Sequence, residues 1–202
     1  MDSRRFRNAL GQFPTGVVVA TARTATDELV GMTMSSFNSV SLDPPLILFS
    51  VHRQAHSFTV WQGIERFAIN VLNEEQEQVS NQFARTGGNK WDGITPLTGE
   101  TGVPLLPNAA VALECQAHAR FDGGDHEIFV GRVTAMHEHA VNRSRPLVFY
   151  EGRYRQLASA ATAHTPPGLA HGAHFTVSSL AEVSRALRGR TLARSAHRGP
   201  SG

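Results

Sequence analysis

Polar and apolar residues alternate most regularly over residues 111–121. Apolar side chains occupy every second position there, and polar or charged ones, beginning with Glu114, occupy the positions between them. A period of two is typical of a β-strand with one face on a core and the other in solvent. The pattern predicts a strand over 111–121, a Gly-rich turn over 122–125 and a returning strand over 127–139.

Shorter apolar runs predict the other strands, and turn-forming Gly, Pro, Asn or Asp residues stand between most of them. Within residues 1–157, only three stretches have a helical pattern. Many short strands with two or three short helices are typical of a β-barrel, so the sequence predicts a mainly β fold with a few short peripheral helices. The additional strands are expected over 17–22, 29–34, 46–51, 67–72, 147–150 and 154–157.

The predicted helices are short. In residues 2–13, the side chains of Phe6, Leu10 and Phe13 recur at i, i+4 and i+7. They form one apolar stripe, which we expect to face the core. The other two helices are expected over 57–62 and, with Asn73 and Gln76 at the spacing of a capping box, over 73–84.

Two residues interrupt this regular pattern. Asn70 is a polar residue inside an apolar strand, so we expect it to be hydrogen-bonded in a structural role, with contact to a ligand as the alternative. Trp91 lies in a long excursion over 85–107 that is rich in Gly, Pro and Thr and is expected to have little regular structure. We expect the indole to cover the core, and the alternative is contact with a ligand or partner.

Composition indicates one domain with an extension. The chain has 202 residues, and after Leu157 it becomes rich in Ala, Thr, Pro, Gly and His. We therefore expect a domain over 1–157 and, over 158–202, a linker with a flexible basic tail. One short helix is predicted within that tail, over 179–189.

The same composition limits the partners. The formal net charge is +2, and most of the basic excess lies in the tail, so we expect no nucleic-acid partner. No apolar run approaches the ~20 residues of a membrane helix, and no secretory signal is visible. The single cysteine, Cys115, fits a buried position in a reducing cytoplasm. The ten histidines include no set with metal-ligand spacing, so no metal is expected.

The stretch over 31–51 joins two unlike halves. Its first half is a hydroxyl-rich run broken by single apolar residues, and its second half is an apolar run entered through Pro44 and Pro45. Hydroxyls and backbone amides at the start of a core strand form a donor surface, which suits a ligand rich in carbonyls and phosphate. The alternative is a Ser/Thr-rich edge strand and turn with no ligand.

This stretch resembles the signature of the short-chain flavin reductase family. The resemblance covers about residues 5–157, and matching motifs follow in order at 15–21, 67–72, 124–126 and 146–150. It implies a Greek-key split β-barrel, the FMN-binding split barrel, which is usually a homodimer. It further implies that NADH or NADPH reduces FMN or FAD, and that the reduced flavin diffuses to a partner monooxygenase.

The resemblance also implies the site residues. His126, in a Gly-Asp-His element, would contribute to the nicotinamide site, while Asp125 is expected to shape the turn. No catalytic side chain is expected, because hydride transfer is chemistry of the cofactors. Ser57 is a candidate for binding a phosphate, and its alternative role is plain helix capping. Arg85 is the candidate cation for that phosphate, and its alternative is a solvated surface arginine. The implied flavin residues are Thr15, Met32, Thr33, Met34, Ser35, Ser36, Ser50, Val51, Ser57, Phe83, Ala84 and Arg85.

Two other functions compete with a reductase. A flavin-binding module would hold or carry flavin without fast turnover. An oxidase of pyridoxamine phosphate on the same barrel would need more phosphate-binding arginines than the stretch over 31–51 offers. Oxidation of nicotinamide in the presence of added flavin separates the reductase from the binding module.

Overall fold

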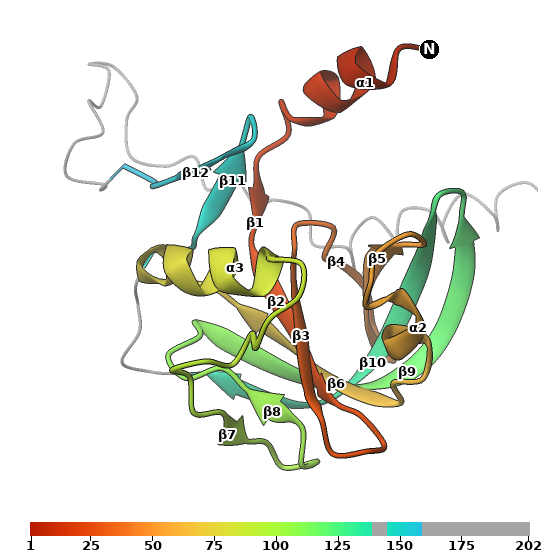
Figure 1. Cartoon of the computed structure of the whole chain (residues 1–202), viewed down its shortest axis with the longest axis vertical. Coiled ribbons are helices and arrows are strands. Elements are labelled where there is room, and N and C mark those ends of the chain that lie inside the picture. Colours follow the sequence, from red (N-terminus) through yellow and green to blue (C-terminus); the bar gives the residue numbers. More distant parts are fainter. Residues whose placement is uncertain (139–144, 159–202) are drawn as a thin grey trace, which may run out of the picture. The chain divides into compact units, whose positions relative to one another are not determined.

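The computed structural model describes residues 1–138 and 145–158, and Figure 1 shows how its elements are arranged. Residues 159–202, which hold most of the predicted linker and tail with its helix over 179–189, are not among them, and neither is His139, the expected last residue of the returning strand. The helical elements are α1 (Ser3–Leu10), α2 (Phe58–Gln62), η1 (Glu74–Gln76) and α3 (Glu77–Ala84). The strands are β1 (Thr15–Gly16), β2 (Val18–Arg23), β3 (Leu29–Met34), β4 (Asn38–Leu42), β5 (Pro45–His52), β6 (Arg66–Val71), β7 (Leu97–Thr98), β8 (Pro104–Leu105), β9 (Val111–Gly123), β10 (His126–Glu138), β11 (Val148–Tyr150) and β12 (Arg153–Arg155).

Seven strands form one antiparallel sheet in the order β3-β2-β6-β9-β10-β5-β4. β3 and β5 stand far apart in this order, yet Met34 of β3 and Val51 of β5 belong to one buried cluster. The sheet therefore curves around a common core, as the strands of a barrel do. The prediction of a mainly β split barrel with a few short helices is confirmed.

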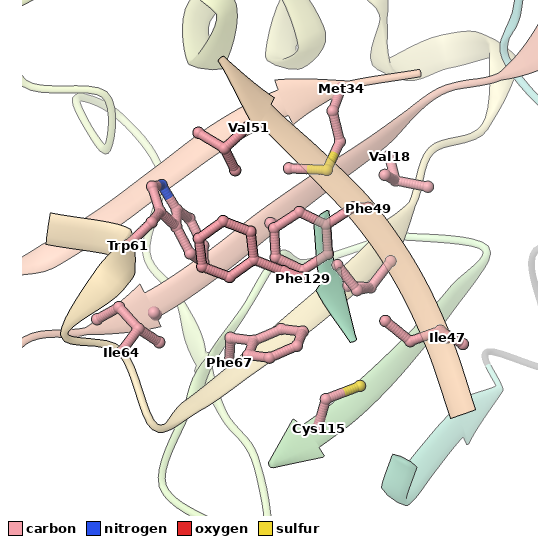
Figure 2. Packing of buried hydrophobic residues seen from close by; sticks show 13 residues of the cluster. Val18, Met34, Ile47, Phe49, Val51, Trp61, Ile64, Phe67, Cys115 and Phe129 are labelled. Atoms are coloured by element: carbon pink, nitrogen blue, oxygen red, sulfur yellow. The ribbon is translucent and has the colours of Figure 1, made fainter. Parts of the chain in front are cut away.

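Aromatic side chains fill this core (Figure 2). The rings of Phe49 and Phe129 stack with their centroids 5.3 Å apart, and Trp61 and Phe67 meet Phe49 edge-on at 5.9 and 5.3 Å. Such pairs stabilise a core by about 0.5–1.5 kcal/mol beyond the burial of their area. Cys115 belongs to the same cluster, as predicted, and burial raises the pKa of its thiol to about 12.

A second buried cluster includes Phe83 of α3 and Trp91. Their rings meet edge-on at 5.1 Å, so the prediction that Trp91 covers the core is confirmed. Asn70 is buried, and its amide nitrogen donates to the Val19 carbonyl at 3.0 Å, while its oxygen accepts from the Leu106 amide at 2.8 Å. The structural role predicted for Asn70 is confirmed.

Local signals predicted several boundaries correctly. The strand expected over 29–34 is β3, and the strand expected over 46–51 lies within β5. The capping box is present: the Asn73 side chain accepts from the Glu75 amide at 2.9 Å, and the Gln76 side chain accepts from the Asn73 amide at 3.2 Å. These signals succeed because they depend on neighbouring residues alone.

The prediction for the first helix is wrong in its packing. Phe6, Leu10 and Phe13 are 50%, 60% and 75% exposed, and α1 has no buried residue. The helix also ends at Leu10 rather than at Phe13. The apolar stripe is real, but the described part of the chain offers no surface that covers it. The stripe therefore does not face the core of its own chain.

The predicted faces of the strand over 111–121 are wrong in three places. Glu114, expected in solvent, is fully buried, whereas Ala117 and Phe121, expected on the core, are exposed, Phe121 by 58%. Glu114 is covered by the excursion over 85–107, whose Glu100 and Thr101 amides donate to its carboxylate at 2.7 and 2.8 Å. One of the two register shifts between β9 and β10 leaves His118 as an extra residue in β9, and it changes which face the residues after it present.

Candidate functional site

β3 is the outermost strand at one side of the sheet, so every second peptide group along it lacks a strand partner. Gly31 carries one of these groups, because its carbonyl accepts a hydrogen bond from Lys90 Nζ at 3.0 Å. A Cβ atom at Gly31 would lie 2.5 Å from the ring of Phe83 in α3. Only glycine allows the ring to come so close, and the edge of β3 is thereby fixed against α3.

Thr33 and Met32 point to opposite sides of β3. Thr33 Oγ1 donates to the Ser80 carbonyl of α3 at 2.6 Å. On the other side, Ser57 Oγ lies 3.8 Å from the Met32 sulfur, and Met34 is buried in the core. The hydroxyls of Thr33 and Ser57 are thus engaged within the chain. Ser57 stands at the N-cap of α2 but makes no side-chain capping bond, so the capping alternative is wrong.

Ser36 joins the end of β3 to β5. Its Oγ accepts from the Ser50 amide at 3.0 Å and donates to the Ser50 carbonyl at 3.2 Å. Val51, the next residue of β5, is buried in the core. The Ser50 side chain therefore points away from that core, and Ser35 and Ser36 stay exposed. The hydroxyl-rich stretch forms a polar rim where the core strand β5 ends.

Thr15 and Ser35 line one cavity of about 690 Å³. Thr15 Oγ1 is buried and has no hydrogen-bond partner among the described residues. A buried hydroxyl without a partner costs about 1–3 kcal/mol, so it marks a place where a ligand or water supplies one. α1, the chain that follows it and the turn after β11 complete the wall, with Leu10, Gln12, Phe13, Phe149 and Glu151 among the lining residues.

The end of α3 contacts the same edge of β3. Phe83 is buried against Gly31, whereas Ala84 and Arg85 are exposed. Lys90 Nζ donates to the Phe83 carbonyl at 3.1 Å as well as to Gly31, which is favourable at the negative end of a helix. Burial lowers the pKa of Lys90. Sequence reasoning missed this cation, although it stands in a Gly-rich loop directly after a predicted helix.

His126 begins β10 and pairs with His52 at the end of β5. Its ring is 40% exposed, lies edge-on to the His52 ring at a centroid distance of 4.9 Å, and has Nδ1 2.7 Å from Asp125 Oδ1. Because Ser50 pairs with Ile128, two residues further along the same strands, His126 lies at the same end of β5 as the polar rim. Sequence reasoning missed His52, which directly follows a predicted strand.

Two features are absent from the described residues. Within residues 1–138 and 145–158, no three His, Cys, Asp or Glu side chains form a group that could hold a metal ion. No helix of these two segments is long and apolar enough to cross a membrane. The polar groups around the cavity and His126 are hydroxyls, backbone amides, imidazoles, basic side chains, the Gln12 amide and the carboxylates of Asp125 and Glu151.

Comparison with known proteins decides the family. The sequence model of the flavin reductase like domain family matches residues 10–158. The chain belongs to this family. The resemblance that the motifs indicated is thus confirmed, and the match covers the flavin reductase-like barrel described above.

Individual relatives agree with the family match. This flavin reductase-like chain is 39% identical over 166 residues to HsaB of Mycobacterium tuberculosis, the reductase subunit of a flavin-dependent monooxygenase, and the match covers 80% of this chain and 86% of HsaB. It is 40% identical over 141 residues to a probable flavin reductase of Rhizobium meliloti, a match that covers 70% of this chain but spans only 45% of that relative. Among solved structures, one similar protein is SgcE6 of Streptomyces globisporus, an NADH:FAD oxidoreductase whose structure is a complex with NAD and FAD fragments. Its TM-score is 0.73 and its sequence identity is 37%, and the match covers 79% of this chain and 95% of SgcE6.

The groups around β3 fit a flavin. The cavity of about 690 Å³ lies within the range of about 300–1,000 Å³ that is usual for ligand sites. Thr15 Oγ1 is a polar atom that still needs a partner, Ser35 is exposed beside it, and the outer edge of β3 carries peptide groups without strand partners. Such groups suit the carbonyls and ring nitrogens of an isoalloxazine.

Proposed function

We propose that this flavin reductase-like chain transfers hydride from NADH or NADPH to FMN or FAD and supplies the reduced flavin to a partner monooxygenase. The observation that carries the proposal is the cavity beside the edge of β3, where Thr15 keeps a buried hydroxyl without a partner. The names of HsaB and SgcE6, a monooxygenase reductase subunit and an NADH:FAD oxidoreductase, support it.

In this proposal the flavin ring lies along the end of β3. Peptide groups at the edge of β3 and Ser35 donate to its polar edge, and the bond between Ser36 and Ser50 holds the rim rigid. Arg85, with Lys90 nearby, is the cation for a flavin phosphate. The full set proposed to contact flavin is Thr15, Met32, Thr33, Met34, Ser35, Ser36, Ser50, Val51, Ser57, Phe83, Ala84 and Arg85.

The chain itself supplies binding and orientation. The flavin, when bound, accepts the hydride that the nicotinamide gives, so no side chain acts as a nucleophile. Fixed donors at the rim stabilise negative charge on the ring edge because they need no reorientation during the reaction. His126, at the same end of β5, is proposed to bind the nicotinamide through a hydrogen bond.

The exposed stripe of α1 supports the proposal of a homodimer. Phe6, Leu10 and Phe13 would lose their exposed apolar area against a second copy of the chain. In sedimentation or light-scattering experiments, the variant Leu10→Lys is expected to have half the mass of the wild type. The control variant Arg4→Ser, on the same helix, is expected to have the mass of the wild type. A wild type that is monomeric at micromolar concentration would contradict the homodimer.

Steady-state kinetics tests the activity. NADH and NADPH are each combined with FMN and with FAD, and oxidation of the nicotinamide is followed. The proposal predicts multiple turnovers with at least one combination. A protein that binds flavin and shifts its absorbance, but oxidises neither nicotinamide, would instead be a flavin-binding module, which is the second candidate.

A pair of variants tests the site. Ser35→Trp places a large side chain in the cavity beside Thr15, so we expect the KM for flavin to rise at least tenfold. Ala25→Trp introduces the same ring at an exposed position in the turn before β3, and we expect the wild-type KM. Equal KM values in the two variants would contradict the proposed position of the flavin.

A further inference from the structure

The β9–β10 turn that carries His126 is held by its neighbour, the segment after β5. Arg53 Nε donates to the Gly124 carbonyl at 3.1 Å, and its Nη2 lies 2.7 Å from Asp122 Oδ1. The Arg53 amide also donates to the Asp125 carbonyl at 2.9 Å. One arginine thus makes contact with three residues of the turn. The turn has one defined position, although most of its side chains are in solvent.

Within this turn, the Asp125 carboxylate faces two imidazoles. Asp125 Oδ1 lies 2.7 Å from His126 Nδ1, and Asp125 Oδ2 lies 3.8 Å from His52 Nε2. The hydrogen bond from His126 holds the pKa of Asp125 below its ordinary value, so the group is an anion at neutral pH. An ionised carboxylate only accepts hydrogen bonds.

These contacts fix which ring nitrogen carries a proton. Because Asp125 can only accept, His126 Nδ1 carries its hydrogen and donates it. His52 is fixed in the opposite sense, since the Gln54 amide donates to its Nδ1 at 3.0 Å and the hydrogen of the neutral ring is then on Nε2. In neutral His126, the Nε2 atom is left as an acceptor that no residue of the turn uses.

We infer that Asp125 is a positioning residue, which holds His126 in the Nδ1–H form so that Nε2 accepts a hydrogen bond from the carboxamide of the nicotinamide. This inference rests on the proposed function, because it takes His126 as a nicotinamide residue. It assigns Asp125 a task beyond shaping the turn. It also distinguishes the carboxamide from the pyrophosphate, since an acceptor nitrogen suits an N–H donor and repels an anion.

Kinetic variants test the inference. Asp125→Ala removes the acceptor and is expected to raise the KM for NADH or NADPH about fivefold to tenfold, with kcat and the KM for flavin within twofold of the wild type. Asp125→Asn keeps an acceptor oxygen and is expected to stay within twofold in all three. Glu28→Ala removes an exposed carboxylate between β2 and β3, which is not part of the β9–β10 turn, and we expect wild-type kinetics. An unchanged nicotinamide KM in Asp125→Ala overturns the inference, as does an Asn variant as impaired as the Ala variant.

A spectroscopic measurement is independent of turnover. In protein labelled with ¹⁵N-histidine, long-range proton–nitrogen NMR distinguishes the two neutral forms of a ring. We expect the Nδ1–H form for His126 in the wild type and in Asp125→Asn, and mainly the Nε2–H form in Asp125→Ala. The Nε2–H form in the wild type would overturn the inference, and turnover by that same protein would leave the proposed function standing. If the wild type turned over no nicotinamide at all, the proposed function itself would fail.

Discussion

The hairpin formed by β9 and β10 carries two carboxylates that each meet a histidine, one deep in the fold and one at its tip. Glu114 is fully buried, and its carboxylate lies 2.5 Å from His137 Nε2 and accepts from the Glu100 amide and from the amide and hydroxyl of Thr101. The side chain of Asp125, at the tip, is 77% exposed. The same chemical pair therefore occurs in two environments.

Burial decides what each pair does. All the partners of Glu114 lie within the chain, so the carboxylate fastens the excursion over 85–107 to the barrel. Its removal leaves several buried donors without an acceptor, which is costly. Asp125 is surrounded by water, which can replace its bonds, so its contribution to stability is small. What Asp125 controls is the orientation of an exposed ring at the site.

The largest expected effect comes from Glu114→Ala. Loss of the buried acceptor is expected to lower the free energy of unfolding by about 3–5 kcal/mol, because Glu100, Thr101 and His137 lose their partner. Unfolding in urea, followed by circular dichroism, measures the change. A loss below about 1 kcal/mol would mean that water replaces the carboxylate and that Glu114 does not fasten the excursion.

Acidification should reduce this effect. Burial raises the pKa of Glu114, but hydrogen bonds from Thr101, His137 and Glu100 outweigh burial and hold the pKa below its ordinary value of 4.5. A carboxyl with a lower pKa in the folded state stabilises the fold above its unfolded pKa, and the stabilisation disappears as the pH falls through the folded pKa. The difference in unfolding free energy between wild type and Glu114→Ala should be full at neutral pH and smaller below about pH 4. Urea titrations across this range test the trend, and a constant difference would contradict it.

The smallest expected effect on stability comes from Asp125→Ala. Exposed substitutions of this kind usually change the free energy of unfolding by less than about 0.5 kcal/mol. The same urea experiment at neutral pH measures it beside Glu114→Ala. If the tip variant lost as much stability as the buried one, the division between a structural and a functional carboxylate would be wrong.

The sequence predicted features that depend on nearby residues. The period of two located β9, and the spacing of Asn73 and Gln76 predicted a capping box that is present. The turn before His126 and the strand after Pro45 were also found, because turn residues and apolar runs are local signals. Family motifs added the barrel topology, which no local pattern contains.

Contacts between distant segments could not be predicted in the same way. Glu114 occupies a position that a period of two assigns to solvent, and it is buried only because residues 99–101 fold over it. His52 and His126 meet through the register of β5 and β10, which are separated in the sequence by nearly half of the domain. Lys90 and Gly31 are also distant in the sequence, and their hydrogen bond depends on how the excursion over 85–107 folds. The stripe of α1 is the converse case, since its pattern is correct but nothing in the described chain covers it.

A crystal structure with FMN or FAD soaked into the protein tests the central claim most directly. The account predicts that the isoalloxazine ring lies along the free edge of β3, with Thr15 and Ser35 beside it and its polar edge toward the rim of Ser36 and Ser50. Flavin bound elsewhere on the barrel, or no flavin at the cavity despite measured binding in solution, would contradict it.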